Sequence, residues 1–306
     1  MVMMERRVHD IFTLTLGMAV LLFCTIHEPL VAANTLQFYD QDIFRIVYST
    51  EGVDGISAVD SNNNAVPDRV EDIATQLVAA RDAFISLEFP DPLQSKRYTG
   101  VTGVMVILRA RSSMHGQHGR AFSMATGSRH FSGKWLKIHI STDTNPSRNP
   151  TPTHEYFHLI QYGQSRFMNG WYLEGMARWA EDAINKNRVA PDAAIDTEKA
   201  LSTTYDAADN LWHPLGGACG GPLHMHPSLA AGYAYVDGTP VFKDTKVNGP
   251  QAMRNVLTCL HEMEAAAADS FGGVPLWRKN GQRSPQNNSF ILECVRATQE
   301  QCARRH

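Results

Sequence analysis

The segment that most limits how this chain can fold is His154-Glu155-Tyr156-Phe157-His158, in which two histidines stand four residues apart with a glutamate between them. On an α-helix, residues four apart lie on one face, about 6 Å apart along the axis. Both imidazoles can then bind one metal ion, and Glu155 lies beside them, where it can take a proton from water. The segment therefore predicts a helix that carries a metal.

The residues around this segment favour the helical interpretation. Thr153 stands directly before the motif as the expected N-cap, and Leu159 and Ile160 continue its apolar face. Gly163 follows at a place where the C-terminus of a helix favours glycine. We therefore expect a helix over 153–162.

A catalytic zinc needs a third protein ligand and an open position for water, and Glu174 is the expected ligand. It lies sixteen residues after His158, enough for a turn and a returning helix over 174–184. The alternative is an exposed carboxylate in the first turn of that helix, favoured by the helix dipole. We prefer the ligand, because the aromatic and apolar neighbours of Glu174 would otherwise bury an unpaired charge. Glu181, two turns further on the same face, is expected to orient a ligand histidine.

Upstream, the segment from Asp60 to Glu71 has oxygen-bearing residues at the spacing of an EF-hand calcium loop. The predicted ligands are the side chains of Asp60, Asn62, Asn64, Asp68 and Glu71 and the main-chain carbonyl of Val66. Ala65 replaces the glycine usual at the sharp turn, and two of the three leading oxygens belong to amides, so we expect a weakened structural calcium site. An Asn-rich turn that caps the next helix is the alternative.

The rest of the chain predicts an α+β fold in which strands come first and helices follow. Strands are expected at 44–49, 101–108 and 135–141, and further helices between Pro67 and Pro90 and over 250–268. The segments 112–133 and 210–227, rich in glycine and other loop-forming residues, are expected to be loops.

The first 33 residues are expected to be a secretory signal peptide, because basic residues precede the apolar stretch 11–26 and small residues at 31–33 offer a cleavage site. A membrane anchor is the alternative, but the stretch is slightly short for a span. No later stretch is long and apolar enough to cross a bilayer. We therefore expect residues 34–306 to be exported, outside the cell or into the periplasm, with no membrane span after removal of the signal.

Four cysteines follow the expected signal peptide, all in the last third of the chain: Cys219, Cys259, Cys294 and Cys302. An even number in an exported chain predicts two disulfides, with three possible pairings. A disulfide between Cys294 and Cys302 would enclose a short segment and is compatible with a cross-link at the end of a helix. Disulfides at these positions would tighten only the C-terminal part.

Composition and charge limit the classes of partner and the number of domains. The chain has 28 Lys and Arg residues against 31 Asp and Glu, a formal net charge of −3, which gives no reason to expect nucleic acid. Hydrophobic residues make up 43%, typical of a chain that buries a core. Without a repeat or a clear linker, we expect one domain over 34–306, with a strand-rich part (34–150) and a helical part (151–306).

Together these motifs resemble the gluzincin zinc metallopeptidases. The HEYFH segment is followed by WYLEGMARWAE, and the likeness is greatest to bacterial secreted metalloproteases with H-E-F-F-H, a later W-x-x-E-x-x-A-x-W-x-E and an upstream D-x-D-x-N-G-V-P-D. The resemblance covers roughly residues 44–185, with gaps. It implies a zincin-like fold with a mixed sheet, zinc ligands His154, His158 and Glu174, and Glu155 as general base.

The resemblance implies a secreted zinc endopeptidase that acts on proteins or peptides. Such enzymes usually offer a tyrosine or histidine to the oxyanion, and of the candidates Tyr233, Tyr205, His224 and His226 we prefer Tyr233. Two other functions stay open: a zincin-fold protein without peptidase activity that binds a protein or glycan through a calcium-stabilised surface, and a zinc hydrolase with a non-peptide substrate. The presence of Glu155 disfavours the first of these.

Overall fold

The computed structural model describes residues 36–128, 131–184, 193–219, 221–270 and 279–304. The chain divides into two units, residues 1–33 and 34–306, of which only the second contains described residues. The expected signal peptide therefore lies outside the described residues. None of the helices in the described ranges has the length and apolar content needed to cross a bilayer.

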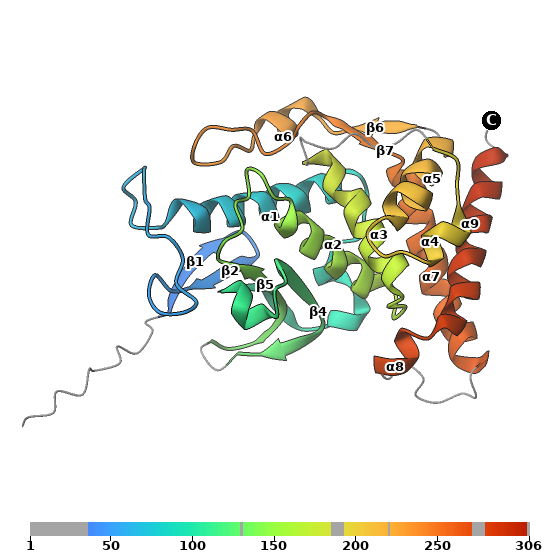
Figure 1. Cartoon of the computed structure of the whole chain (residues 1–306), viewed down its shortest axis with the longest axis horizontal. Helices are drawn as coiled ribbons and strands as arrows, with labels where there is room; N and C mark the ends of the chain where they lie inside the picture. The colour runs from blue at the N-terminus through green and yellow to red at the C-terminus, as the bar shows by residue number, and fades with distance from the viewer. Residues whose placement is uncertain (1–35, 129–130, 185–192, 220, 271–278, 305–306) are drawn as a thin grey trace, which may run out of the picture. The chain divides into compact units, whose positions relative to one another are not determined.

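The second unit contains a mixed five-stranded sheet followed in the chain by helices, which confirms the α+β prediction (Figure 1). Its strands are β1 (Gln37–Gln41), β2 (Phe44–Tyr48), β3 (Val101–Arg109), β4 (Gly119–Gly127) and β5 (Lys134–Ser141). They lie in the order β1-β2-β3-β5-β4. The three inner strands run parallel to one another, and the two edge strands, β1 and β4, pair antiparallel with their neighbours.

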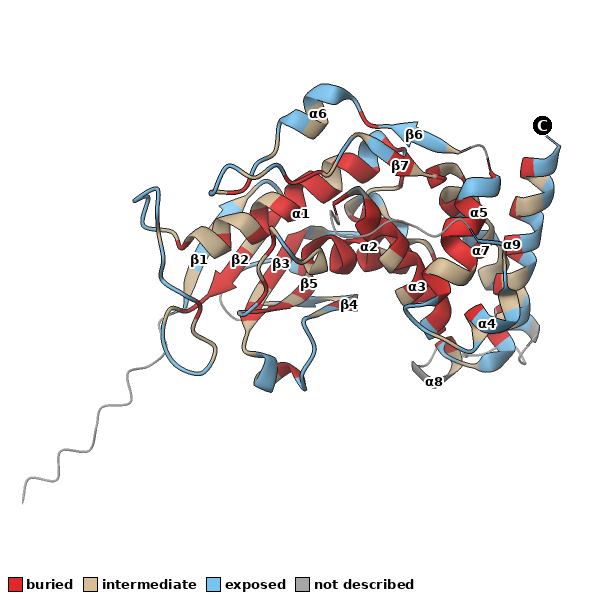
Figure 2. Ribbon diagram, turned by 45° about the horizontal axis from the view of Figure 1, so that its top comes forward, coloured by how far each residue is buried: buried red, intermediate tan, exposed pale blue. Residues whose placement is uncertain are grey.

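The two faces of this sheet differ because side chains alternate along each strand. Ile46, Val106 and Ile138 belong to the main core, with the helices α1 (Asp68–Ser86) and α2 (Thr151–Gln164), which pack on that face. On the other face, Val47 and Met105 belong to a much smaller cluster. Figure 2 shows the buried residues of α1, α2 and the central strands side by side.

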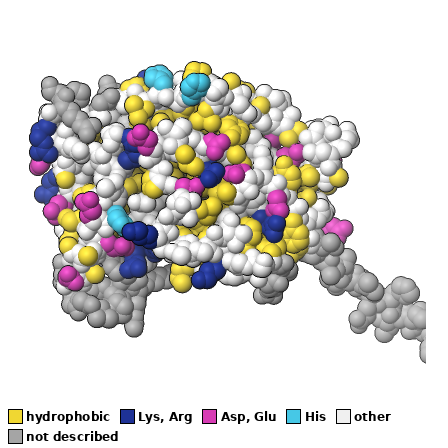
Figure 3. Space-filling view, turned by 180° about the vertical axis from the view of Figure 1, so that it is seen from behind, with side chains coloured by type: hydrophobic (Ala, Val, Ile, Leu, Met, Phe, Trp, Pro, Cys, Tyr) yellow, Lys and Arg dark blue, Asp and Glu magenta, His cyan; other side chains and the backbone are white. Residues whose placement is uncertain are grey.

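The helical part follows the sheet in the chain. Its helices are α3 (Gly170–Ala180), α4 (Thr197–Leu201), α5 (His213–Ala218), α6 (Pro227–Ala231), α7 (Pro250–Ser270), α8 (Lys279–Gln282) and α9 (Asn288–Ala303). Short turns of other helix types are η1 (Pro92–Gln94), η2 (Lys96–Tyr98), η3 (Arg111–Met114), η4 (Glu181–Ala183), η5 (Ala208–Trp212) and η6 (Pro285–Asn287), and a two-stranded ribbon pairs β6 (Pro222–His224) with β7 (Lys246–Asn248). On the face seen in Figure 3, acidic and basic side chains are interspersed.

Two predicted loops contain regular structure. The segment 112–133 includes β4, whose glycines and serine gave no strand signal, and which is held by pairing with β5. The segment 210–227 includes α5 and β6. In both places tertiary contacts outweigh weak local propensity.

The disulfides pair Cys219 with Cys302 and Cys259 with Cys294. The suggested pairing of Cys294 with Cys302 is wrong, because both residues lie on α9, eight positions apart. Eight residues of helix rise about 12 Å, beyond the reach of a disulfide. The observed bridges instead join α9 to the end of α5 and to the middle of α7.

We expect reduction of the two disulfides to loosen the contacts of α9 with α5 and α7 and to leave α2 protected. The bridges close loops of 83 and 35 residues, and loops of this size give about 4 kcal/mol each in the chain-entropy model. Hydrogen exchange with and without reductant measures the effect helix by helix. Equal loss of protection in α2 and α9, or four free thiols in the exported protein by mass spectrometry, would contradict this expectation.

Candidate metal centre

The structure brings His154 and His158 on α2 together with Glu174 on α3. Their ligand atoms all lie within 4.8 Å of one another. The Nε2 atoms of His154 and His158 are 3.1 Å and 3.6 Å from Oε2 of Glu174. A tetrahedral zinc with bonds of about 2.0–2.1 Å separates its ligand atoms by about 3.3 Å. The three side chains therefore fit the predicted zinc site.

The helix that carries the histidines begins earlier than expected. It starts at Thr151, and Oδ1 of Asn149 accepts hydrogen bonds from the backbone N–H (2.9 Å) and hydroxyl (2.6 Å) of Thr151. The predicted N-cap Thr153 lies inside the helix, where its hydroxyl bonds to Oε1 of Gln76 on α1 at 3.4 Å. The earlier start of the helix leaves the spacing of the two histidines unchanged.

Each histidine is oriented through its Nδ1 atom. Nδ1 of His154 lies 2.8 Å from Oε1 of Glu181, as expected from the sequence, and Nδ1 of His158 lies 2.8 Å from Oε1 of Gln161. The Gln161 amide nitrogen donates to the Leu173 carbonyl at 3.2 Å, which turns its oxygen toward His158. Both Nδ1 atoms therefore carry hydrogen, and both Nε2 atoms face Glu174.

Sequence reasoning did not identify Gln161. The available signal was its position three residues after His158, which places it on the same face of the helix. Its bond to the backbone of α3 also ties the helix with two histidines to the helix with Glu174.

The carboxylates around His154 favour a positive charge at the point where His154, His158 and Glu174 meet. Burial lowers the pKa of His154, but hydrogen bonds to Glu174 and Glu181 outweigh burial and raise that pKa to about 10. Burial raises the pKa of Glu174, but hydrogen bonds from His154 and His158 prevail and hold it well below its usual range. A proton on His154 thus supplies positive charge where a metal would supply it.

At pH values below the pKa of His154, we expect zinc affinity to increase about tenfold for each unit by which the pH is raised. The reason is that zinc must displace the proton from that imidazole. Because the pKa of His154 is raised to about 10, zinc affinity should depend on pH throughout the neutral range. Above this pKa His154 is already neutral, and the dependence should disappear. Competition titration with a chromophoric chelator at several pH values measures the slope. The same affinity at about pH 6 and about pH 8 would contradict the expectation.

Glu155 is buried beside the group, with 6% of its surface exposed. Its Oε2 has no hydrogen-bond partner among the described residues, and burial raises its pKa. The backbone of Ala121 on β4 donates a hydrogen bond to the carboxylate. A Cβ at Gly119, also on β4, would lie 2.5 Å from Oε1 of Glu155, so this close approach requires glycine. The carboxylate is held by the edge strand and keeps one oxygen available.

Of the four candidates for an oxyanion donor, Tyr205 lies at the group. Its ring centroid is 6.1 Å from that of His154. Burial, the carboxylates of Glu174 and Glu155 and a hydrogen bond to Glu174 raise its pKa to about 12. The hydroxyl therefore keeps its proton at neutral pH and can donate it in a hydrogen bond.

The preferred candidate, Tyr233, is not brought to the metal group. Its hydroxyl donates to Asp82 on α1. The side chains of His224 and His226 are exposed and bond to Thr245 at 3.2 Å and to a neighbouring serine at 2.7 Å. Tyr205 therefore takes the place of Tyr233 as the candidate donor to the oxyanion.

In the predicted calcium loop, hydrogen bonds engage the side chains of four of the six expected ligands, Asp60, Asn62, Asn64 and Glu71. Both carboxylate oxygens of Glu71 accept hydrogen bonds from side-chain amides, Nδ2 of Asn62 at 3.0 Å and Nδ2 of Asn64 at 2.7 Å. The carboxylate of Asp60 accepts from the backbone of Asn64 and Ala65. The left-handed φ of 68° at Ala65 is the turn at which glycine was expected.

Of the other two expected ligands, Asp68 bonds to Ser61, and the contact of Val66 involves its N–H and not the carbonyl expected as a ligand. Asp68 accepts two hydrogen bonds of 2.8 Å from the backbone and hydroxyl of Ser61, and the N–H of Val66 donates to Asn64 at 2.9 Å. Among the described residues, the only group of three His, Cys, Asp or Glu side chains with converging ligand atoms is the one around Glu174. A calcium ion would have to replace the amide contacts of Glu71.

We expect calcium to raise the melting temperature through this loop. A ligand at a hundredfold excess over its dissociation constant adds about 2.7 kcal/mol to the free energy of unfolding. Calorimetry with calcium should show the shift in the parent and a smaller one or none in Asp60→Ala. Magnesium, which demands a tighter octahedral shell, is the control. An unchanged melting temperature of the parent in excess calcium would refute the site.

Comparison of the chain with models of protein families, with curated proteins and with solved structures gave no match. The arrangement of the described side chains is therefore the basis of the functional assignment.

Proposed function

We propose that this protein is a secreted zinc endopeptidase with a zincin-like fold of the gluzincin type. The observation that carries the proposal is the approach of His154, His158 and Glu174 to one point beside a buried Glu155 with an unpartnered oxygen. A purely structural ion pair would not need that second carboxylate. The two disulfides support an oxidising compartment and hence export.

In the proposed enzyme His154, His158 and Glu174 would hold the zinc. When bound, zinc supplies a Lewis acid that polarises the scissile carbonyl and lowers the pKa of a water molecule toward about 7. Glu181 and Gln161 keep the Nδ1 atoms protonated, which would leave both Nε2 atoms to bind the metal.

Glu155 is the proposed general base. Its free Oε2 takes the proton of the attacking water, and the resulting acid delivers that proton to the leaving amine. Burial raises the pKa of this carboxyl, which makes it a better proton acceptor than an exposed glutamate. The Ala121 N–H fixes the carboxylate while it exchanges the proton.

Tyr205 is the proposed donor to the oxygen that becomes negative as the carbonyl is attacked. It lies against His154 and is hydrogen-bonded to Glu174 in this structure. A donor preset at the place where charge develops stabilises the transition state more than the ground state.

The edge strand β4 is the proposed site for the substrate backbone. β4 pairs with β5 on one side, and no described strand pairs with its other edge. Through Gly119 and Ala121 it also contacts Glu155. An extended peptide added to this edge would form backbone hydrogen bonds and present its carbonyls beside the general base.

Turnover of casein by residues 34–306, with and without a zinc chelator, tests this function. We expect hydrolysis that the chelator abolishes and that added zinc restores. Zinc bound at one equivalent without hydrolysis of casein or gelatin would favour a non-peptide substrate. Absence of bound zinc would favour the binding-protein alternative.

A further inference from the structure

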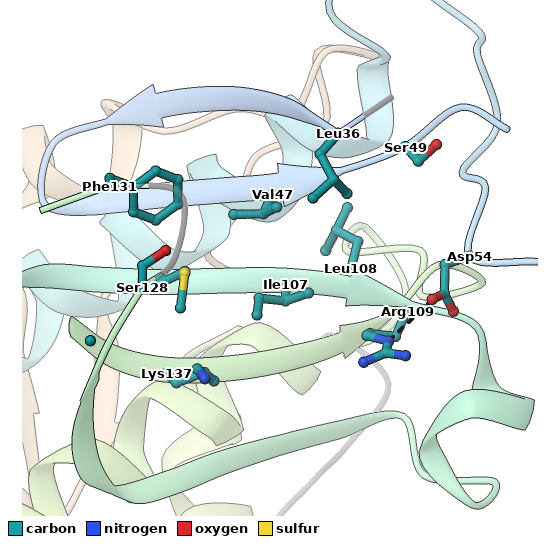
Figure 4. Close-up of a pocket in the computed structure, with 12 residues that line it drawn as sticks. Leu36, Val47, Ser49, Asp54, Ile107, Leu108, Arg109, Ser128, Phe131 and Lys137 are labelled. Atoms are coloured by element: carbon teal, nitrogen blue, oxygen red, sulfur yellow. Dashed lines mark hydrogen bonds and ion pairs between the residues drawn. The ribbon is translucent and has the colours of Figure 1, made fainter. Parts of the chain in front are cut away.

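The face of the sheet turned away from α1 and α2 carries a pocket of about 430 Å³ (Figure 4). Val47, Met105 and Ile107, from β2 and β3, line it. Parallel strands are normally covered on both faces, but here only a small cluster lies on the second face. The volume falls within the range of small-molecule sites, about 300–1,000 Å³.

This pocket is separate from the metal centre. Ile46 and Val106, the chain neighbours of its lining residues, point to the opposite face and pack in the main core with α2. No residue of the metal group lines the pocket. A ligand here would therefore bind whether or not zinc is present.

The charges around the pocket leave one cation uncompensated. Nε of Arg109 donates to Oδ2 of Asp54 at 3.2 Å, so these two charges offset each other. Lys137, on β5, is partly buried, and its ammonium forms no ion pair or hydrogen bond with any described residue. A partly desolvated, unpaired ammonium favours an anion as its partner.

The neighbouring His139 is exposed to the same positive charges. Burial and the charges of Arg109, Lys137 and Arg120 lower its pKa to about 4. The imidazole is therefore neutral at physiological pH and adds nothing to the charge. The positive charge available to a ligand is that of Lys137.

The sheet register sets the length of the ligand. Lys137 pairs with Met105, and Ile107 pairs with Val47, so the lining crosses from β5 over β3 to β2. Three neighbouring strands span about 10 Å. An extended alkyl chain of roughly eight carbons, with C–C bonds of about 1.5 Å, has this length. Leu36, 40% exposed, lies at the far side of the pocket.

We propose that this pocket binds a medium-chain fatty carboxylate, whose carboxylate pairs with Lys137 and whose alkyl chain crosses Met105 and Ile107 toward Val47. The apolar lining buries the chain, and the single cation selects one negative group. The site is independent of the proposed peptidase activity.

Calorimetric titration of residues 34–306 with octanoate, butanoate and 1-octanol tests the site. We expect octanoate to bind with a dissociation constant below about 1 mM, tighter than butanoate, which lacks most of the apolar chain. Lys137→Met should weaken octanoate at least about tenfold and leave 1-octanol unchanged, because only the carboxylate uses the charge. Lys134→Met, on the same strand but outside the pocket, is the matched control.

A filling variant tests the apolar part. Ile107→Phe should weaken octanoate and 1-octanol alike, whereas Glu155→Gln should bind both like the parent. No octanoate binding at about 1 mM, equal binding of butanoate, or an effect of Lys134→Met as large as that of Lys137→Met would overturn the proposal. Because the lysine substitutions lie on partly or fully exposed side chains, they test it even if Ile107→Phe fails to fold.

Discussion

Replacing Glu155 by glutamine is expected to leave zinc bound and to reduce peptide hydrolysis by about 10²–10⁴-fold, the usual contribution of a general acid–base residue. Glutamine keeps the size of the side chain, and its oxygen can still accept the Ala121 N–H. The amide cannot take a proton from water, so the substitution removes the proton transfer and little else. Bound zinc by elemental analysis, measured beside casein turnover, separates the two roles.

The matched control is Glu262→Gln, an equal change of charge at an exposed position of α7. It should retain parental activity. Glu155→Gln should also melt no lower than the parent, because a neutral amide costs less to bury than a carboxylate. Parental hydrolysis in Glu155→Gln would exclude this residue as the base, whatever its zinc content.

The convergence of His154, His158 and Glu174 was predictable because most of the information is local. The spacing of His154 and His158 fixes their common face once the segment is helical. The helix expected over 174–184 is observed as α3 over 170–180, and Glu181 begins the short turn η4 directly after it, from where it still reaches His154. α3 begins at Gly170, so Glu174 lies in its second turn and not in its first. The helix-dipole alternative for this carboxylate therefore loses its structural basis.

What the sequence did not reveal depends on contacts between distant segments. β4 has little alternation, and only its pairing with β5 and its approach to Glu155 through Gly119 give it a role. Choosing Tyr205 over Tyr233 as the oxyanion donor required knowing which of the two tyrosines lies close to α2 in the folded chain. The disulfide pairing depends on the packing of α9 against α5 and α7, which the spacing of the cysteines does not reveal.

His158→Ala and Glu174→Ala are each expected to weaken zinc binding by about 10³-fold. A structural zinc site has about 10–16 kcal/mol of binding free energy, so the loss of one of three protein ligands removes roughly 4 kcal/mol. Glu181→Gln should have a smaller effect, about 10–100-fold, because it only orients His154. The expected order of affinity is therefore parent, then Glu181→Gln, then the two ligand variants together.

Glu198→Ala is the control that separates a ligand from a helix-end carboxylate. Glu198 lies in the first turn of α4, where it interacts with the helix dipole, and it is not part of the metal group. Glu198→Ala should leave zinc affinity unchanged, although it removes one negative charge from a helix, as Glu174→Ala does. Competition titration of all four variants gives the comparison. Parental zinc affinity in Glu174→Ala would remove Glu174 from the ligand set, whereas a loss as large in Glu198→Ala would show that net charge, and not coordination, controls the metal.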